Sequence, residues 1–177
     1  MGNRMEYIPE KEISAILGQI EAIHPKYSLM LRIGVESGLR VSDVLRIRAG
    51  DVKREMRIWE AKTKKVKEWV PTVGLVEEMG KHVERYGLRE RDYLIFSREG
   101  KDKAVHRTTA YRVLRAAGEG MGLSRIGTHS MRKTYARRVY RETGDIGEVQ
   151  KRMGHEDVRT TLMYFFDVFE LEKYINL

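Results

Sequence analysis

The sequence contains no cysteine and no long apolar run. Its 177 residues therefore cannot form a disulfide or a thiolate metal site, and a reducing compartment is compatible with the chain. No stretch approaches the ~20 apolar residues that a membrane-spanning helix needs. The N-terminus also lacks the apolar stretch of a signal peptide. We therefore expect a soluble, cytoplasmic protein that has no membrane partner.

What the chain does have is enough apolar residues for a core, together with excess positive charge. Apolar residues make up 41% of the sequence, which fits a single folded domain of this length. The net charge is +8, and the excess is concentrated in residues 39–70 and 101–164, with a nearly neutral stretch between them. Two basic blocks favour a polyanionic partner, most simply double-stranded DNA. A lysine-rich solvated surface is the alternative.

Hydrophobic spacing predicts a mainly α-helical domain with a small antiparallel β-sheet. Apolar residues recur every three or four positions over most of the chain, and they alternate only around residues 52–71. A polar, lysine-rich stretch at 61–67 interrupts that alternation and predicts a hairpin tip. The predicted helices begin near residues 8, 27, 40, 73, 106, 129, 146 and 158, the last of them running to 166. The predicted strands cover 52–59 and 68–71, and a short buried segment is expected at 92–96.

Two cationic positions stand out in the first basic block. Arg40 lies at a tight turn after the helix stop Ser37-Gly38, and Asp43 follows within reach of the arginine or of the free helix amides. A surface arginine beside a capping acid would look the same. Lys62 lies in the hairpin tip, where a flexible ammonium could reach a bound polyanion.

The last forty residues before the tail gather cations, imidazoles and one phenol. His129 and Arg132 are three residues apart, so they share one face of a helical first turn, where free amides already favour an anion. A second helix is expected to end at Gly154 and to present His155, and Tyr164 follows nine residues later. These residue types indicate chemistry on a phosphate. A metal site is not expected, because no Asp or Glu completes a ligand set with the histidines.

Taken in order, these motifs resemble the catalytic domain of the tyrosine recombinases, the phage integrase family. The pattern is Gly-Leu-Arg-x-Ser-Asp, a hairpin Lys, His-x-x-Arg, Gly-His, and then Tyr. The segment HSMRKTYA…MGHEDVRTTLMY is the most specific part. The resemblance implies a family-like fold, Tyr164 as the nucleophile, Asp43 as support for the first arginine, and phosphate-activating roles for Arg40, Lys62, His129, Arg132 and His155.

The implied activity is site-specific DNA recombination through a covalent 3′-phosphotyrosine, with no cofactor, metal or ATP. Two alternatives stay open: DNA relaxation like that of a type IB topoisomerase, against which His129 argues because that class usually has Lys there, and a non-catalytic DNA-binding relative. Further DNA contacts are expected on exposed basic residues, although these could equally be solubility charges. They are Lys64, Lys65, Arg107, Arg112 and Arg115.

The resemblance divides the chain into a catalytic domain over residues 1–166 and a tail over 167–177. The tail is acidic and amphipathic, and it is expected to form a helix that docks on a neighbouring subunit or packs on its own domain. Many family members carry an additional N-terminal DNA-clamping domain, and none is expected in this chain. A natural minimal enzyme and a truncated one are both consistent with that. We expect a homo-oligomer, a tetramer, on DNA and allow a monomer without it.

Overall fold

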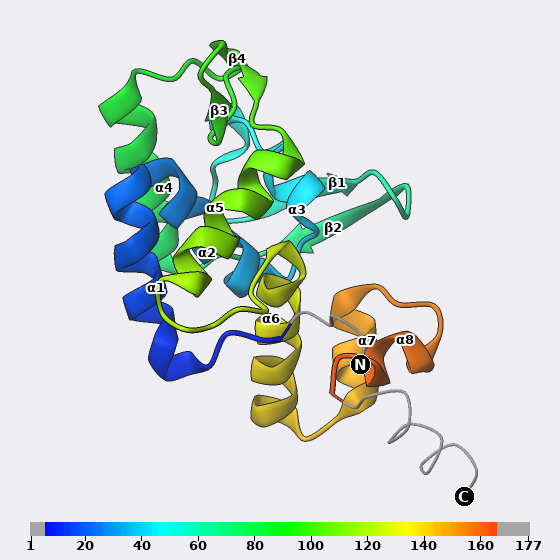
Figure 1. Ribbon diagram of the computed structural model, residues 1–177. Coiled ribbons are helices and arrows are strands. Elements are labelled where there is room, and N and C mark those ends of the chain that lie inside the picture. The colour runs from blue at the N-terminus through cyan, green and yellow to red at the C-terminus, as the bar shows by residue number, and fades with distance from the viewer. Residues whose placement is uncertain (1–5, 166–177) are drawn as a thin grey trace, which may run out of the picture.

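The structure is a computed structural model that describes residues 6–165. The predicted mainly helical fold with small antiparallel sheets is confirmed (Figure 1). Two short hairpins, β1–β2 and β3–β4, accompany the helices. The elements of this part of the chain are α1 (Glu10–Ile23), α2 (Pro25–Ser37), α3 (Val41–Val44), the 3₁₀ turn η1 (Ala49–Asp51), β1 (Met56–Glu60), β2 (Lys65–Trp69), α4 (Val73–Tyr86), β3 (Phe96–Ser97), β4 (Gly100–Ala104), α5 (Arg107–Glu119), α6 (Thr128–Thr143), α7 (Ile146–Met153) and α8 (Val158–Leu162).

Helix α6 joins two apolar clusters. Its N-terminal half contributes Met131 to the main core, which α1, α2, α4, α5 and β1 also line. Its later turns contribute Tyr135, Ala136 and Val139 to a smaller cluster that includes Val149 and Met153 of α7. Figure 1 shows α6 between the larger lobe and the pair α7–α8. Residues on α6 between the two clusters therefore face the junction where both parts of the chain meet.

Glycines end the two helices that lead into candidate site residues. Gly38 follows α2 with φ +65°, and Gly154 follows α7 with φ +64°. Both values lie in the left-handed region that glycine adopts without a Cβ penalty. Each glycine turns the chain sharply, so that Arg40 and His155 follow a helix C-terminus at short range. Both helix stops agree with the sequence prediction.

The β1–β2 hairpin is where the predicted boundaries need correction. The strand predicted over 52–59 begins only at Met56, because η1 and a bend occupy the residues before it. Buried and exposed side chains then alternate along β1. The second strand begins at Lys65, earlier than the predicted 68, and pairs with β1 in the register Met56 to Trp69 through Glu60 to Lys65. The tip is therefore shorter than predicted, and Lys67 lies in a strand.

The predicted helix over 158–166 is also shorter than expected. Helix α8 ends at Leu162, and Tyr164 lies in the turn that follows it. Asp157 caps α8 as predicted, since its carboxylate accepts the backbone N–H of Arg159 at 2.8 Å. The predicted tail helix at 167–177 lies outside the described residues. Within residues 6–165, no helix is both long and apolar enough to cross a membrane.

Candidate active site

Arg132 lies at the centre of the candidate site and is almost fully buried, with 2% of its surface exposed. Its guanidinium donates to the Gly38 carbonyl, to the Met153 carbonyl at 3.1 Å, and toward Nε2 of His155 at 3.4 Å. Arg132 therefore holds the ends of α2 and α7 against α6. These contacts engage three of the five guanidinium N–H groups, and no other residue in 6–165 engages the remaining two.

His155 is fixed from both sides of its ring. Nδ1 lies 3.0 Å from the hydroxyl of Thr161, which is fully buried on α8. Nε2 faces Arg132, a group that can only donate, so in this state Nε2 is the acceptor and Nδ1–H donates to Thr161. A hydroxyl both donates and accepts. Thr161 can therefore serve the other tautomer as well, in which Nε2–H points at a ligand.

Tyr164 packs beside His155. The two ring centroids are 5.3 Å apart, at an interplanar angle of 47°. Tyr164 and Phe165 also pack against the small cluster of α6 and α7, so Tyr164 is half-buried. The phenol ring of Tyr164 therefore lies close to His155, which in turn contacts Arg132.

Arg40 is held by an acid that the sequence did not single out. Its Nη1 donates to Glu60 Oε1 at 2.9 Å, and only 6% of the Glu60 side chain is exposed. Asp43, the expected supporting acid, is fully buried, and its carboxylate accepts the backbone N–H of Ala61 at 3.2 Å. Burial raises the pKa of Asp43, while the hydrogen bond from the Ala61 N–H and the charge of Arg40 oppose that rise. Asp43 thus anchors the start of the hairpin tip rather than forming an ion pair with Arg40.

Lys62 and His129 complete the predicted set, and both remain exposed. Neither side chain has a hydrogen-bond partner within the described part of the chain. Lys62 follows directly after Ala61, the residue that Asp43 fixes. His129 lies in the first turn of α6, one turn before Arg132. Both are therefore free to turn toward a bound group.

The electrostatics show that the cations converge on the two imidazoles. Burial, followed by nearby positive charges, lowers the pKa of His155 from 6.5 to about 4. Those charges belong, in decreasing order, to Arg132, Arg40, Lys62 and Lys67. Partial burial and the charges of Arg132, Lys133, Arg40 and Lys62 likewise lower the pKa of His129. Both imidazoles are therefore mainly neutral at pH 7 and can accept a proton, while the surrounding cations favour an anion.

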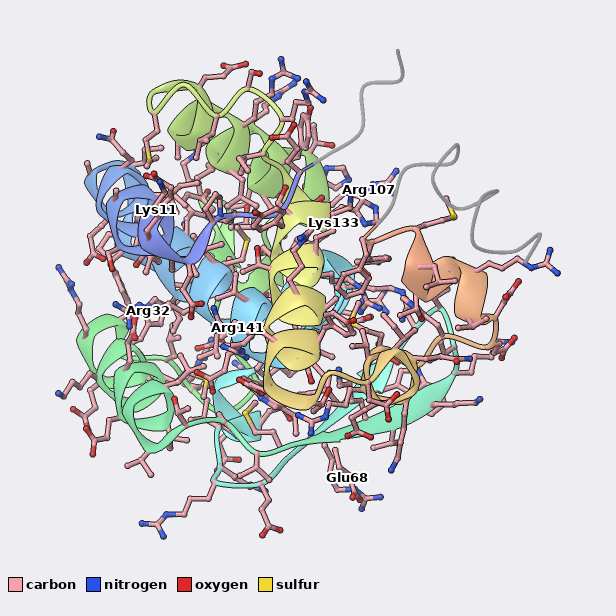
Figure 2. All side chains as sticks on the ribbon, turned by 90° about the horizontal axis from the view of Figure 1, so that it is seen from below. Lys11, Arg32, Glu68, Arg107, Lys133 and Arg141 are labelled. Atoms are coloured by element: carbon pink, nitrogen blue, oxygen red, sulfur yellow. The ribbon has the colours of Figure 1, made fainter. Side chains whose placement is uncertain are left out.

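The expected DNA-contacting residues fall into two groups. Lys64 and Lys65 are exposed at the hairpin tip, and Lys65 lies 4.0 Å from the carboxylate of Glu156. Arg107 and Arg112 are exposed on α5, with no ion-pair partner in the described part. Figure 2 shows Arg107 among the side chains near the first turns of α6. Arg115 differs, since it is half-buried and donates to Glu119 and Tyr111 within its own helix.

Three residues that support the site were not predicted as such: Glu60, Thr161 and Lys67. Glu60 had a usable signal, because an acid at an inward position of an alternating strand must find a cation. Lys67 alternates inward on the partner strand for the same geometric reason. Thr161 gave no signal, since its contact with His155 depends on the turn between α7 and α8. No group of three His, Cys, Asp or Glu side chains placed to hold a metal occurs in residues 6–165.

Comparison with known proteins decides the family. The model of the phage integrase family matches residues 6–170. The chain belongs to the phage integrase family. This confirms the resemblance on which the site residues were first assigned.

Individual proteins are similar to this chain over part of their own length. The probable integrase/recombinase YoeC of Bacillus subtilis (strain 168) is 35% identical over 133 residues, which are 74% of this chain and 72% of YoeC. The crystal structure of XerA recombinase shares the fold with a TM-score of 0.77 at 21% identity, covering 99% of this chain and 66% of that one. XerH site-specific recombinase bound to difH substrate gives a TM-score of 0.73 at 21% identity, covering 97% and 54%. This chain therefore spans between about half and three quarters of these proteins.

Proposed function

We propose that this chain is a site-specific DNA recombinase that cuts and rejoins DNA strands through a phosphotyrosine. The observation that carries the proposal is the convergence of Arg132, His155 and Tyr164, with contacts of 3.4 Å between the first two and 5.3 Å between the two rings. The three residues come from α6, the turn after α7 and the turn after α8. Membership of the phage integrase family, and the DNA-bound state of the XerH structure, support DNA as the substrate.

In the proposed reaction, the Tyr164 oxygen attacks the phosphorus and the bond to the 5′ oxygen breaks. The phenolic proton passes to His129, which is the general base because its lowered pKa leaves it neutral. Lys62 gives a proton to the departing 5′ oxygen. The new phosphotyrosine bond retains the energy of the broken one, so a 5′-hydroxyl from another strand can reverse the step without ATP.

Charge on the phosphate is the main barrier, and the arginines lower it. As phosphorus becomes five-coordinate, negative charge grows on its two non-bridging oxygens. Arg40 and Arg132 each retain unengaged N–H groups in the described structure, and guanidinium pairs with such oxygens in a bidentate manner. His155, in the tautomer with Nε2–H, donates a further hydrogen bond.

The proposed partners follow from the chemistry. The basic residues of the hairpin tip and α5 bind the duplex on either side of the cleaved phosphate. Each copy supplies one Tyr164 and cuts one strand, while exchange between two duplexes cuts four strands. We therefore expect four copies to act together on paired DNA.

The test uses duplexes nicked just downstream of the cleaved phosphate, so that the short fragment with the new 5′-hydroxyl is released after cleavage and rejoining is impossible. A pool with randomised sequence around the nick, incubated with EDTA present, is expected to yield a covalent protein–DNA adduct on a denaturing gel. Sequencing the trapped DNA then supplies the preferred duplex. Tyr164→Phe is expected to abolish the adduct while keeping salt-dependent binding, and the half-buried Tyr86→Phe on α4 serves as the matched control.

Two outcomes would contradict this proposal. Adduct formation by Tyr164→Phe at the wild-type rate would remove Tyr164 from the nucleophile's role. Relaxation of supercoiled plasmid without strand exchange between two duplexes would point to a topoisomerase instead.

A further inference from the structure

Lys67 is a half-buried cation at the back of the candidate site. Strand β2 alternates its side chains, so Glu68 points away from the helices at the outer edge of the hairpin (Figure 2) while Lys67 turns inward. Its ammonium donates to the Ser37 carbonyl at 2.7 Å and to the Arg152 carbonyl at 3.0 Å. It also lies 5.3 Å from the centre of the Tyr135 ring on α6. One side chain of the hairpin thus contacts three helices.

These contacts parallel those of Arg132. Lys67 donates to the carbonyls of Ser37 and Arg152. Arg132 donates to the carbonyls of the residues that follow these two in the chain, Gly38 and Met153. Both pairs lie at the C-terminal ends of α2 and α7, where unsatisfied carbonyls and the helix dipole favour cations. Two positive side chains therefore clamp the same two helix ends from opposite elements, β2 and α6.

We propose that Lys67 is a positioning residue for strand cleavage, which fixes the ends of α2 and α7 so that Arg40 and His155 face one phosphate. The inference rests on the proposed function. Arg132 spends three of its five N–H groups on these helix ends and on His155, so any shift of its guanidinium toward a bound phosphate with the remaining two would also pull on the carbonyls that it holds. With Lys67 holding the neighbouring carbonyls, the helix ends keep their separation when Arg132 engages DNA.

The surroundings of Lys67 disfavour its positive charge. Burial and the charges of Arg132 and Arg40 lower its pKa to about 8, and the nearby carboxylate of Glu60 partly offsets them. The remaining neighbours on the packed elements are the phenol of Tyr135 and backbone carbonyls. An apolar side chain would avoid this desolvation but would leave the Ser37 and Arg152 carbonyls without this donor, so the cation holds the two helix ends together at a cost in desolvation.

The experiment compares Lys67→Met and Lys67→Arg in the full chain on the nicked duplex that the wild type selects. Lys67→Met is expected to slow adduct formation at least tenfold while the dissociation constant for the duplex changes less than threefold. Lys67→Arg, which can donate to both carbonyls, is expected to restore most of the rate. Lys11→Met removes the same charge from an exposed site on α1, which both figures place across the molecule from α7 and α8, and it should behave as wild type.

A pH series separates positioning from a merely structural role. Above pH 8 the wild-type ammonium loses its proton, whereas arginine stays charged. The rate of wild type relative to Lys67→Arg should therefore fall as pH rises from 7 to 9. Dividing the wild-type rate by the Lys67→Arg rate removes the effect of the other titratable groups, which both proteins share. The comparison does not need Lys67→Met, so it still tests the proposal if that variant does not fold.

Each result has one meaning. If wild type forms no adduct with any duplex in the pool, the proposed function fails and this inference with it. If wild type forms the adduct and folded Lys67→Met matches its rate, or the ratio stays constant across the pH range, only the role of Lys67 is refuted.

Discussion

Replacing Thr161 by valine removes one hydroxyl while keeping the shape of the side chain. That hydroxyl lies 3.0 Å from Nδ1 of His155 and is fully buried, so nothing in the described structure replaces it. Leaving a buried polar group without its partner costs about 1–3 kcal/mol. If the contact aligns His155 in the transition state, the rate of adduct formation should fall by about 5- to 150-fold.

The assay measures single-turnover adduct formation on the selected nicked duplex, alongside duplex affinity and thermal unfolding. Thr160→Val is the matched control, because the adjacent residue is exposed and undergoes the same hydroxyl-to-methyl change. Thr161→Ser keeps the hydroxyl and should recover most of the rate. The affinity for DNA should change little, since Thr161 is fully buried and presents no surface to a duplex.

Equal rates for folded Thr161→Val and Thr160→Val would refute the reasoning. That result would mean that the hydrogen bond between Thr161 and Nδ1 does not hold the His155 ring in place for the reaction.

Two further predictions concern stability. Gly38→Ala should lower the free energy of unfolding by about 2–4 kcal/mol, because φ is +65° there and an added Cβ would collide with the Tyr135 ring on α6. Gly74→Ala is the control: it lies in open space on α4 and should raise the free energy of unfolding by about 0.5 kcal/mol. Urea melts in which both variants showed the same effect would contradict this prediction. Acidification should destabilise the protein through His155, since a pKa depressed from 6.5 to about 4 means that the unfolded chain binds more protons over that range. This contribution is fully present above pH 6.5 and lost on descending to pH 4; it is about 1–2 kcal/mol once solvent screening of a half-buried ring is included. His155→Gln should flatten the melting temperature against pH in that window, and an unchanged slope would assign the effect to other groups.

The sequence predicted the helices that carry the site because their ends are marked locally. Gly38 and Gly154 stop α2 and α7, and Asp157 caps α8, so the turns that present Arg40 and His155 could be placed without coordinates. Each signal depends only on backbone chemistry within a few residues. The catalytic assignments came from the family resemblance, and their roles remain predictions.

The contacts that support the site could not be predicted in the same way. The contact between Lys67 and α7 joins residues 85 positions apart, and that between Arg132 and the end of α2 joins residues 94 apart. Hydrophobic periodicity says which face of an element is buried, but not which other element covers it. The error at the first strand had a local cause, since Val52 is in phase with the buried Met56 and Ile58 and extended the predicted strand back to it, although η1 and a bend precede β1.

The most direct test of the central claim is to locate the atom that DNA attaches to. Adduct trapped on the nicked duplex would be digested with nuclease and protease, and the nucleotide-bearing peptide sequenced by mass spectrometry. We predict a single modified residue, Tyr164, carrying a 3′-phosphoryl nucleotide. Attachment to any other side chain, or through a 5′-phosphate, would contradict the proposed site and its chemistry.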